Sequence, residues 1–184
     1  MKKILIISPT YNEIENIQLF IDSVFNFADL SLLIVDDNSP DGTAEVVKSN
    51  IKKNKRLHLI SRPKKLGLGT AYVAAFSWFL KSDYQYCVQM DCDFSHNPKD
   101  LIRLQQELKN GSDLVIGSRY CSGGKVKNWP FKRILMSYFA SVYVRLILFI
   151  SIKDTTAGFK GYRIEVLNKI KLDDIHFKGY AFQI

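Results

Sequence analysis

The stretch 84-YQYCVQMDCD-93 decides how the chain folds, because an apolar run in it ends in two aspartates. Residues 84–90 read as a buried strand, and side chains two positions apart in an extended chain point the same way. Asp91 and Asp93 can therefore direct both carboxylates at one point. A hard divalent cation prefers such ligands and completes its shell with water and substrate phosphates. The pair predicts a cation that holds a nucleotide diphosphate; in the alternative, one aspartate caps the next helix and the other is solvated.

Short apolar strands alternate with amphipathic segments from residue 4 to residue 117. Ser39 is expected to be the N-cap of one helix with Pro40 at its first position, and Asn97-Pro98 to open another. The spacing predicts strands at 4–8, 32–35, 57–60, 84–90 and 114–117, and further helices at 13–27 and 70–80. This alternation indicates an α/β fold with a mostly parallel sheet and helices on both faces. In such sheets ligands bind beyond the carboxyl ends of the strands.

Length and composition favour one globular domain over residues 1–184, with 47% hydrophobic and 24% charged residues. The apolar end, residues 180–184, reads like the start of another element, so we expect a chain truncated at its C-terminus. The net charge of +8 indicates an anionic partner: nucleic acid, a membrane surface or a phosphorylated substrate. Signatures of the RRM and helix-turn-helix classes are missing from the sequence, which disfavours nucleic acid.

Cysteine usage and the N-terminus both favour a cytoplasmic location. The cysteines at 87, 92 and 121 form no C-x-x-C pair, which predicts reduced thiols rather than disulfides or a zinc site. The apolar run that follows Met1-Lys2-Lys3 is too short for a signal peptide.

Residues 131–152 form an almost wholly apolar segment that we expect to be helical. Its length from Ile134 is close to that of a membrane-spanning helix. However, a polar residue recurs every four positions, which forms a stripe along a helix and places an arginine near the middle. The stripe residues are Arg133, Ser137, Ser141 and Arg145. A packing helix, a helix lying at a membrane interface and a transmembrane span all remain open. A basic cluster, residues 125–133, adjoins this segment.

Three other expected strands also end in polar residues, and their carboxyl ends should converge with Asp91 and Asp93 on one edge of the sheet. Six motifs in these places, in this order, resemble family 2 glycosyltransferases of the GT-A fold, and more narrowly dolichol- or polyprenol-phosphate mannosyltransferases. The motifs are SPTYNEIENI (8–17), LIVDDNSPDGT (33–43), KKLGLGTAY (64–72), QMDCDFSHNP (89–98), LVIGSRY (114–120) and DTTAGFKGYR (154–163). The resemblance covers nearly the whole chain.

The resemblance implies a nucleoside site built from the first two strand ends. Pro9, Tyr11, Glu13 and Asp37 would hold the nucleoside, and Val35 would line the pocket of the base. In alternative readings, Tyr11 is a packing residue and Glu13 only an acid in the first turn of a helix.

The resemblance also implies a phosphate and metal site. Asp91 and Asp93 would match the D-x-D motif that binds Mg²⁺ or Mn²⁺ together with the donor diphosphate. Cys92 takes the middle position, where relatives often carry alanine, and Ser95 takes a position where they often carry glutamine. The residues that would contact phosphate are Arg119 and Arg133. Asp154 matches a family motif and is expected either to organise the acceptor side or to form a turn.

These roles predict an inverting, metal-dependent transfer of a hexose from a nucleotide sugar to a polyprenyl or dolichyl phosphate at the cytoplasmic face of a membrane. The resemblance favours mannose from GDP-mannose. The sequence offers no strong general base, and an anionic phosphate acceptor needs none, whereas a sugar hydroxyl does. The alternatives are a family 2 enzyme with UDP-glucose or another donor, one with a glycan acceptor, and a nucleotide-sugar binding protein without turnover.

Overall fold

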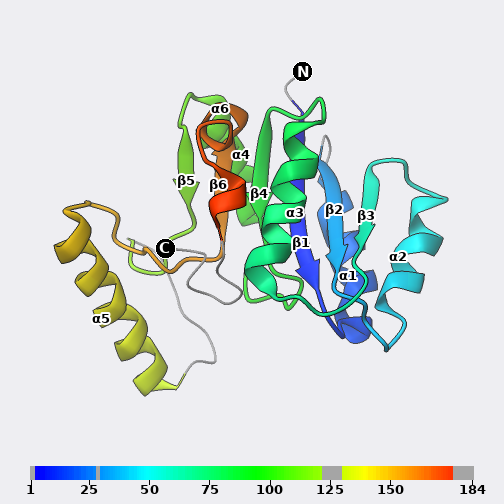
Figure 1. Ribbon diagram of the computed structural model, residues 1–184, viewed down its shortest axis with the longest axis horizontal. Coiled ribbons are helices and arrows are strands. Elements are labelled where there is room, and N and C mark those ends of the chain that lie inside the picture. The colour runs from blue at the N-terminus through cyan, green and yellow to red at the C-terminus, as the bar shows by residue number, and fades with distance from the viewer. Residues whose placement is uncertain (1–2, 28–29, 122–129, 176–184) are drawn as a thin grey trace.

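The computed structural model describes residues 3–27, 30–121 and 130–175 and contains a six-stranded sheet of order β3-β2-β1-β4-β6-β5 (Figure 1). The strands are β1 (Ile4–Thr10), β2 (Leu30–Asp36), β3 (Leu57–Ser61), β4 (Tyr86–Gln89), β5 (Leu114–Ile116) and β6 (Lys160–Arg163). Strands β1 to β4 are mutually parallel, and β6 is antiparallel to both β4 and β5. Strand β5 therefore runs in the same direction as β1 to β4. The predicted mostly parallel α/β sheet is confirmed.

The sequence analysis missed β6. Its four residues, KGYR, contain two cations and a glycine, so no apolar run marks it as a strand. It forms because β4 and β5 offer their backbone groups on either side, with Gln89 opposite Lys160 and Ile116 opposite the same lysine. The hydroxyl of Tyr162 also donates to the side-chain oxygen of Gln89 at 3.0 Å. Strand β6 thus begins at the edge where β4 and β5 end.

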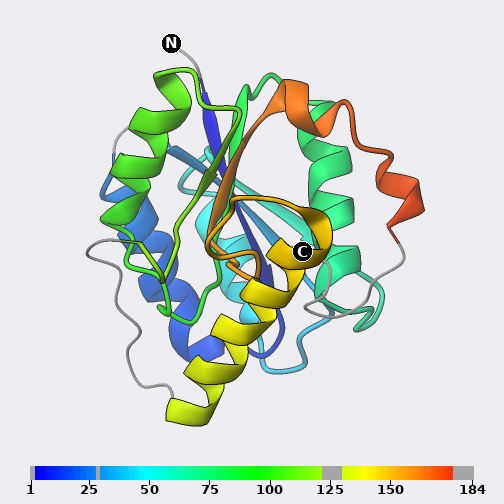
Figure 2. The ribbon, with the colours of Figure 1, turned by 90° about the vertical axis from the view of Figure 1, so that its left-hand side faces the viewer.

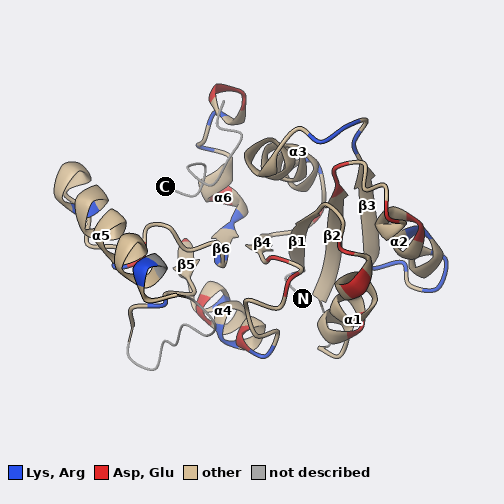
Figure 3. Ribbon diagram, turned by 90° about the horizontal axis from the view of Figure 1, so that it is seen from below, with Lys and Arg blue, Asp and Glu red and all other residues tan. Residues whose placement is uncertain are grey.

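Helices cover both faces of the sheet, as Figure 3 shows from below. One layer contains α1 (Ile14–Phe25), α2 (Thr43–Ile51) and α4 (Asp100–Lys109), and the other contains α3 (Leu68–Leu80) and α6 (Ile164–Leu167). Strand side chains alternate between the two layers: Ile4 and Ile6 pack with α1, whereas Leu5 and Ile7 pack with α3. Because both faces are buried, the inner strands read as continuous apolar runs.

The prediction that Ser39 and Pro40 begin a helix is wrong, since α2 begins at Thr43. The hydroxyl of Ser39 donates to Asp36 at 2.6 Å and also accepts from the backbone N–H of Asn12, so it is engaged in joining two loops. Gly42 occupies the N-cap position instead, and Oδ1 of Asp41, one residue earlier, accepts from the backbone N–H of Thr43. Local cap preferences were overridden by contacts between loops.

The predicted helix start at Asn97-Pro98 is two residues early, because α4 begins at Asp100. Asn97 still organises the approach: its side-chain oxygen accepts from the backbone N–H of Lys99, and its carbonyl accepts from that of Asp100. A short turn therefore precedes the helix.

The apolar segment near residues 131–152 forms α5 (Phe131–Leu148), which ends at Phe149 in a left-handed conformation with a φ of 53°. Figure 1 shows α5 standing apart from the layered sheet, beyond β5, and Figure 2 turns this side toward the viewer. Among the described residues, no helix has the length and apolar character needed to cross a membrane.

Strained backbone is concentrated at the carboxyl edge of the sheet. Asn12 after β1, Asn38 after β2 and Phe94 after β4 all have φ values near +60°, at 59°, 61° and 57°. Residues other than glycine adopt this region rarely, and such strain gathers where a site demands a particular backbone. The edge where ligands are expected is therefore also the edge with the most constrained loops.

Candidate functional site

Asp91 and Asp93 lie just past the end of β4, close enough for their charges to interact. Asp91 is mostly buried, and its Oδ1 accepts a hydrogen bond of 3.4 Å from the hydroxyl of Tyr72 on α3. Burial, together with the charge of Asp93, raises the pKa of Asp91 to about 6, although the hydrogen bond from Tyr72 acts in the opposite direction. Two neighbouring carboxylates of like charge are thus held at an electrostatic cost.

The donor set at this corner fits a divalent cation, because a cation would relieve that cost. Magnesium in particular is commonly held by one or two carboxylates together with substrate phosphates. Within the described ranges, no group of three His, Cys, Asp or Glu side chains is placed to hold a metal. A cation here would therefore depend on Asp91, Asp93 and oxygens of a ligand.

The residues around the pair are mostly structural in the geometry observed. Cys92 points into the core, and burial raises the pKa of its thiol, so the thiol is no ligand at neutral pH. The exposed Ser95 donates its backbone N–H to Oδ1 of Asp93 at 2.9 Å, which orients that carboxylate. His96 stacks on Phe159 with ring centroids 5.0 Å apart.

Metal-free protein should become less stable as the pH rises through the pKa of Asp91. An unfolded aspartate ionises near 3.8 but folded Asp91 near 6, so the folded state binds the proton more tightly and stability falls with rising pH. The penalty above the folded pKa is about 3 kcal/mol at most. Urea unfolding in EDTA at a series of pH values should show this fall in the wild type and not in Asp91→Asn.

Manganese should restore the lost stability at high pH in the wild type only, because the variant retains one carboxylate at this corner. Parallel stability curves for the two proteins across the whole pH range would show that Asp91 is not held as the structure indicates.

Pro9, near the end of β1, and Tyr11 and Glu13, in the loop that follows, lie beside the end of β2. The ammonium group of Lys65 lies over the ring of Tyr11, 3.7 Å from the ring centroid, in a cation–π contact. The backbone N–H of Glu13 donates to the hydroxyl of Thr43, and its carboxylate accepts from Asn16. Glu13 is thus the N-cap residue of α1, one position before the first turn in which the alternative reading placed it.

Asp37 is buried at the end of β2 and holds a neighbouring loop. Its Oδ2 accepts from the backbone N–H groups of Leu66 and Gly67, both at 3.0 Å, and its Oδ1 lies 2.7 Å from Nη1 of Arg62. Val35, which precedes it in β2, is buried in the core beneath α3. The sequence analysis missed Arg62, because a lone arginine in a basic stretch carries no signal that it pairs with a distant aspartate.

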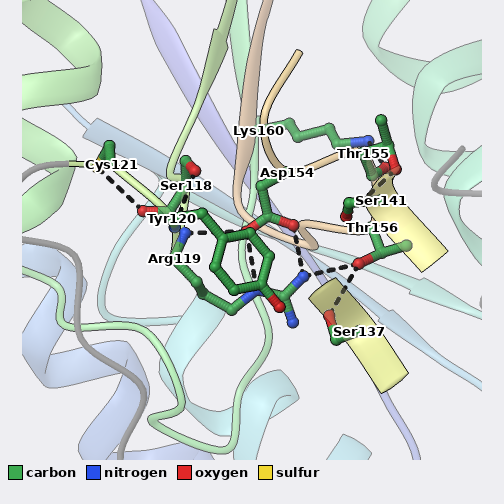
Figure 4. Close-up of polar contacts among 10 residues, drawn as sticks. All are labelled: Ser118, Arg119, Tyr120, Cys121, Ser137, Ser141, Asp154, Thr155, Thr156 and Lys160. Carbon is green, nitrogen blue, oxygen red and sulfur yellow. Dashed lines mark hydrogen bonds and ion pairs between the residues drawn. The ribbon is translucent and has the colours of Figure 1, made fainter. Parts of the chain in front are cut away.

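Arg119, in the loop after β5, is held by the buried carboxylate of Asp154 (Figure 4). Oδ2 of Asp154 accepts from the backbone N–H of Arg119 at 2.9 Å and from Nε at 2.8 Å, and Oδ1 accepts from Nη2 at 2.6 Å. Nη2 also donates to the hydroxyl of Thr156 at 2.7 Å. Apart from its place in the DTTAGF motif, nothing in the sequence marks Thr156 as a partner of Arg119.

The carboxylate pair and the arginine belong to one region of the edge. His96 lies within electrostatic reach of both: burial lowers its pKa, the charge of Asp93 raises it and that of Arg119 lowers it. The side chain of Arg133 and residues 122–129, which include Lys125 and Lys127 of the basic cluster, lie outside the part of the chain that the structure describes. The same is true of the apolar end, residues 180–184.

Comparisons with known proteins assign this chain to a family. A model of glycosyl transferase family 2 matches residues 5–171. The chain is 45% identical over 185 residues to a polyprenol monophosphomannose synthase of Mycolicibacterium smegmatis, covering 100% of this chain and 70% of that protein. It is 43% identical over 183 residues to an undecaprenyl-phosphate mannosyltransferase of Micrococcus luteus, covering 99% of this chain and 75% of that protein.

A solved structure supports the fold. The chain is similar, with a TM-score of 0.63 and 17% identity, to the mannosyltransferase PcManGT of Pyrobaculum calidifontis, solved in complex with GDP-Man and Mn²⁺. The match covers 98% of this chain and 50% of that one, so this chain spans about half the length of the solved protein. With a GT-A-like sheet and a family match over most of its length, the chain belongs to glycosyl transferase family 2 and is similar to the polyprenyl-phosphate mannosyltransferases.

Proposed function

We propose that this chain is a single glycosyltransferase domain that transfers mannose from GDP-mannose to a polyprenyl or dolichyl phosphate, with inversion at the anomeric carbon. The observation that carries the proposal is the 45% identity with a polyprenol monophosphomannose synthase across the whole chain. The carboxylate pair after β4 and the arginine after β5 lie at the edge where such a donor would bind.

Asp91 and Asp93 would hold Mg²⁺ or Mn²⁺. When bound, the cation would supply Lewis-acid stabilisation of the diphosphate that leaves. The guanidinium of Arg119 would bind phosphate oxygens and stabilise the negative charge that develops on them as the sugar departs. Ser95 keeps one carboxylate oriented through its backbone N–H.

The nucleoside would lie over the ends of β1 and β2, near Pro9, Tyr11 and Glu13. Asp37 would act on it mainly by holding the loop of residues 62–67 in place, since its carboxylate is engaged there. Val35 would support this floor from the core.

A phosphate acceptor suits a site without a dedicated base. A phosphate monoester is already anionic near neutral pH, because its second pKa is about 6. The nucleophilic oxygen therefore loses no proton as the bond to the sugar forms, and no side chain is needed to accept one. Arg133, at the start of α5, would contribute to holding this anion.

Peripheral contact with a membrane, at its cytoplasmic face, would bring the lipid acceptor to the site. Helix α5 contains no acidic residue, and two serines of its polar stripe face the protein, since Ser141 is buried and Ser137 contacts Thr156. Its large apolar side chains are exposed instead, among them Phe131, Met136, Phe139, Tyr143 and Leu146. An apolar face of this kind suits a helix lying in a membrane interface.

Incubation with radiolabelled GDP-mannose, Mn²⁺ and polyprenyl phosphate should transfer the label into an organic-extractable lipid. Parallel reactions with UDP-glucose should give at least about tenfold less, because a pocket built to hydrogen-bond one base rejects another strongly. EDTA is the control and should stop the reaction.

Each alternative gives a different result in this assay. Label found only in water-soluble glycan would make the acceptor a sugar hydroxyl, and preference for UDP-glucose would overturn the donor. Binding of GDP-mannose without any transfer would indicate a nucleotide-sugar binding protein.

A further inference from the structure

A connected polar cluster surrounds Asp154 and joins three separate segments (Figure 4). The loop after β5 contributes Arg119, helix α5 contributes Ser137 and Ser141, and strand β6 contributes Lys160. The residues between α5 and β6 lie at its centre. The donor and acceptor chemistry described above gives these central residues no part.

The carboxylate of Asp154 fixes both the position and the plane of the Arg119 guanidinium. Its two oxygens engage Nε and Nη2, a bidentate arrangement that allows one orientation of the planar group, and the backbone N–H of Arg119 binds the same carboxylate. Asp154 is fully buried, whereas the arginine side chain remains 17% exposed. The guanidinium is thus anchored from inside the protein, with part of its surface toward the open edge.

Thr156 adds a second anchor, which α5 supports. Its hydroxyl accepts from Nη2 of Arg119 at 2.7 Å and lies 3.3 Å from the hydroxyl of Ser137. The neighbouring Thr155 donates to Ser141 at 3.5 Å, and the ammonium of Lys160 donates to the carbonyl of Thr155, also at 3.5 Å. Residues 154–156 are therefore held on two sides while they hold the arginine.

Charge also favours a site that receives an anion. Among the residues drawn in Figure 4, the cations Arg119 and Lys160 accompany the one carboxylate of Asp154, so this set of side chains carries a net positive charge. Burial lowers the pKa of Lys160 to about 8, while the charge of Asp154 opposes that shift and that of Arg119 adds to it. An arginine placed only for stability would need no such excess.

We propose that Asp154 and Thr156 are positioning residues, which hold the Arg119 guanidinium in the orientation that binds the diphosphate of the nucleotide sugar. This inference rests on the proposed function, because it assigns the diphosphate to Arg119. Asp154 and Thr156 themselves touch no ligand in this account, and they act only through the arginine.

A double-mutant cycle on diphosphate affinity tests the inference. Binding of GDP and of UDP, each with Mn²⁺, is measured by calorimetry for the wild type, Arg119→Ala, Asp154→Asn and the double variant. We expect about 30-fold weaker binding for Arg119→Ala and about tenfold for Asp154→Asn. If Asp154 acts only through Arg119, the double variant binds within about twofold of Arg119→Ala.

The control is Asp113→Asn, which removes the carboxylate of another ion pair of the β5–β6 region. Asp113 lies 3.4 Å from Arg163 and is 73% exposed, so its loss should leave affinity unchanged. Single-variant losses that multiply in the double variant would overturn the inference, because Asp154 would then act independently of Arg119. Wild-type affinity in Asp154→Asn would overturn it as well.

If Asp154→Asn does not fold, the variant Thr156→Val still tests whether residues of this cluster act through Arg119. It removes one hydrogen-bond acceptor and should weaken diphosphate binding about threefold in the wild type and not at all in Arg119→Ala. No effect in either background would contradict the inference. A wild type that binds neither diphosphate would remove both this inference and the proposed function, whereas binding with an additive cycle would remove this inference alone.

Discussion

Replacing Asp93 with alanine is expected to lower metal-dependent sugar transfer by about 10³-fold or more. The variant removes one of the two carboxylates that would hold the cation, and loss of about 4 kcal/mol of transition-state stabilisation corresponds to that factor. The exposed position of Asp93 means that the fold does not depend on it. The measurement is the initial rate of transfer at saturating donor, with Mn²⁺ varied up to millimolar concentrations.

The matched control is Asp100→Ala, which removes a carboxylate nearby in the sequence, at the start of α4. Asp100 is 3.7 Å from Arg103 in an exposed pair, so its loss should change the rate by no more than about twofold. Calorimetric binding of Mn²⁺ should be weakened in Asp93→Ala and preserved in Asp100→Ala. A fully active Asp93→Ala would remove the cation from this corner and with it the assignment of the site.

The part of this site that follows β4 could be predicted because its signal is local. Apolar strand residues followed by two aspartates place carboxylates at a sheet edge whatever the rest of the chain does. The mostly parallel sheet and the helices on both of its faces follow from the same alternation of short apolar runs with helical spacing. Strand β6 could not be predicted in this way, because the residues KGYR are extended only through their pairing with β4 and β5.

Partners far apart in the sequence could not be predicted. Asp37 looks like a ligand-binding residue in its motif, but in the structure its carboxylate pairs with Arg62 and accepts hydrogen bonds from the backbone N–H groups of residues 66 and 67. Arg119 looks like a phosphate-binding residue, and its partner Asp154 lies 35 positions away. Spacing carries no information on such pairs, because each depends on how two loops meet.

The direction in which α5 faces is another feature that the pattern alone left open. The four-residue recurrence identified a polar stripe, and on most surface helices such a stripe faces water. Here Ser137 and Ser141 face residues 154–156 of the protein itself, which leaves the apolar side outward. Polar partners on the protein body, rather than the composition of the helix, decide this orientation.

Introducing charged residues on the outer face of α5 is therefore expected to prevent the protein from binding to lipid vesicles. Phe139 and Leu146 are 59% and 69% exposed and lie on one side of the helix, two turns apart. Replacing both with glutamate removes about 3 kcal/mol of apolar burial, which weakens binding about 100-fold, and the new charges are repelled by anionic lipid. Flotation with vesicles containing phosphatidylglycerol measures the change.

The control is Leu19→Glu on α1, where an equally exposed leucine, at 64%, lies on a helix with polar neighbours such as Gln18 and Asp22. It should float with vesicles as the wild type does. Transfer to a short, water-soluble prenyl phosphate should be preserved in the α5 variant, since the cation corner and Arg119 are untouched, whereas transfer to a long-chain acceptor in vesicles should fall with binding. The wild type could instead fail to bind vesicles and form a dimer that Phe139→Glu/Leu146→Glu converts to monomers. In that case a second copy of the chain would be the partner of this face. That outcome would overturn the membrane-binding role of α5, because an exposed apolar face can be buried by another protein molecule as well as by a membrane.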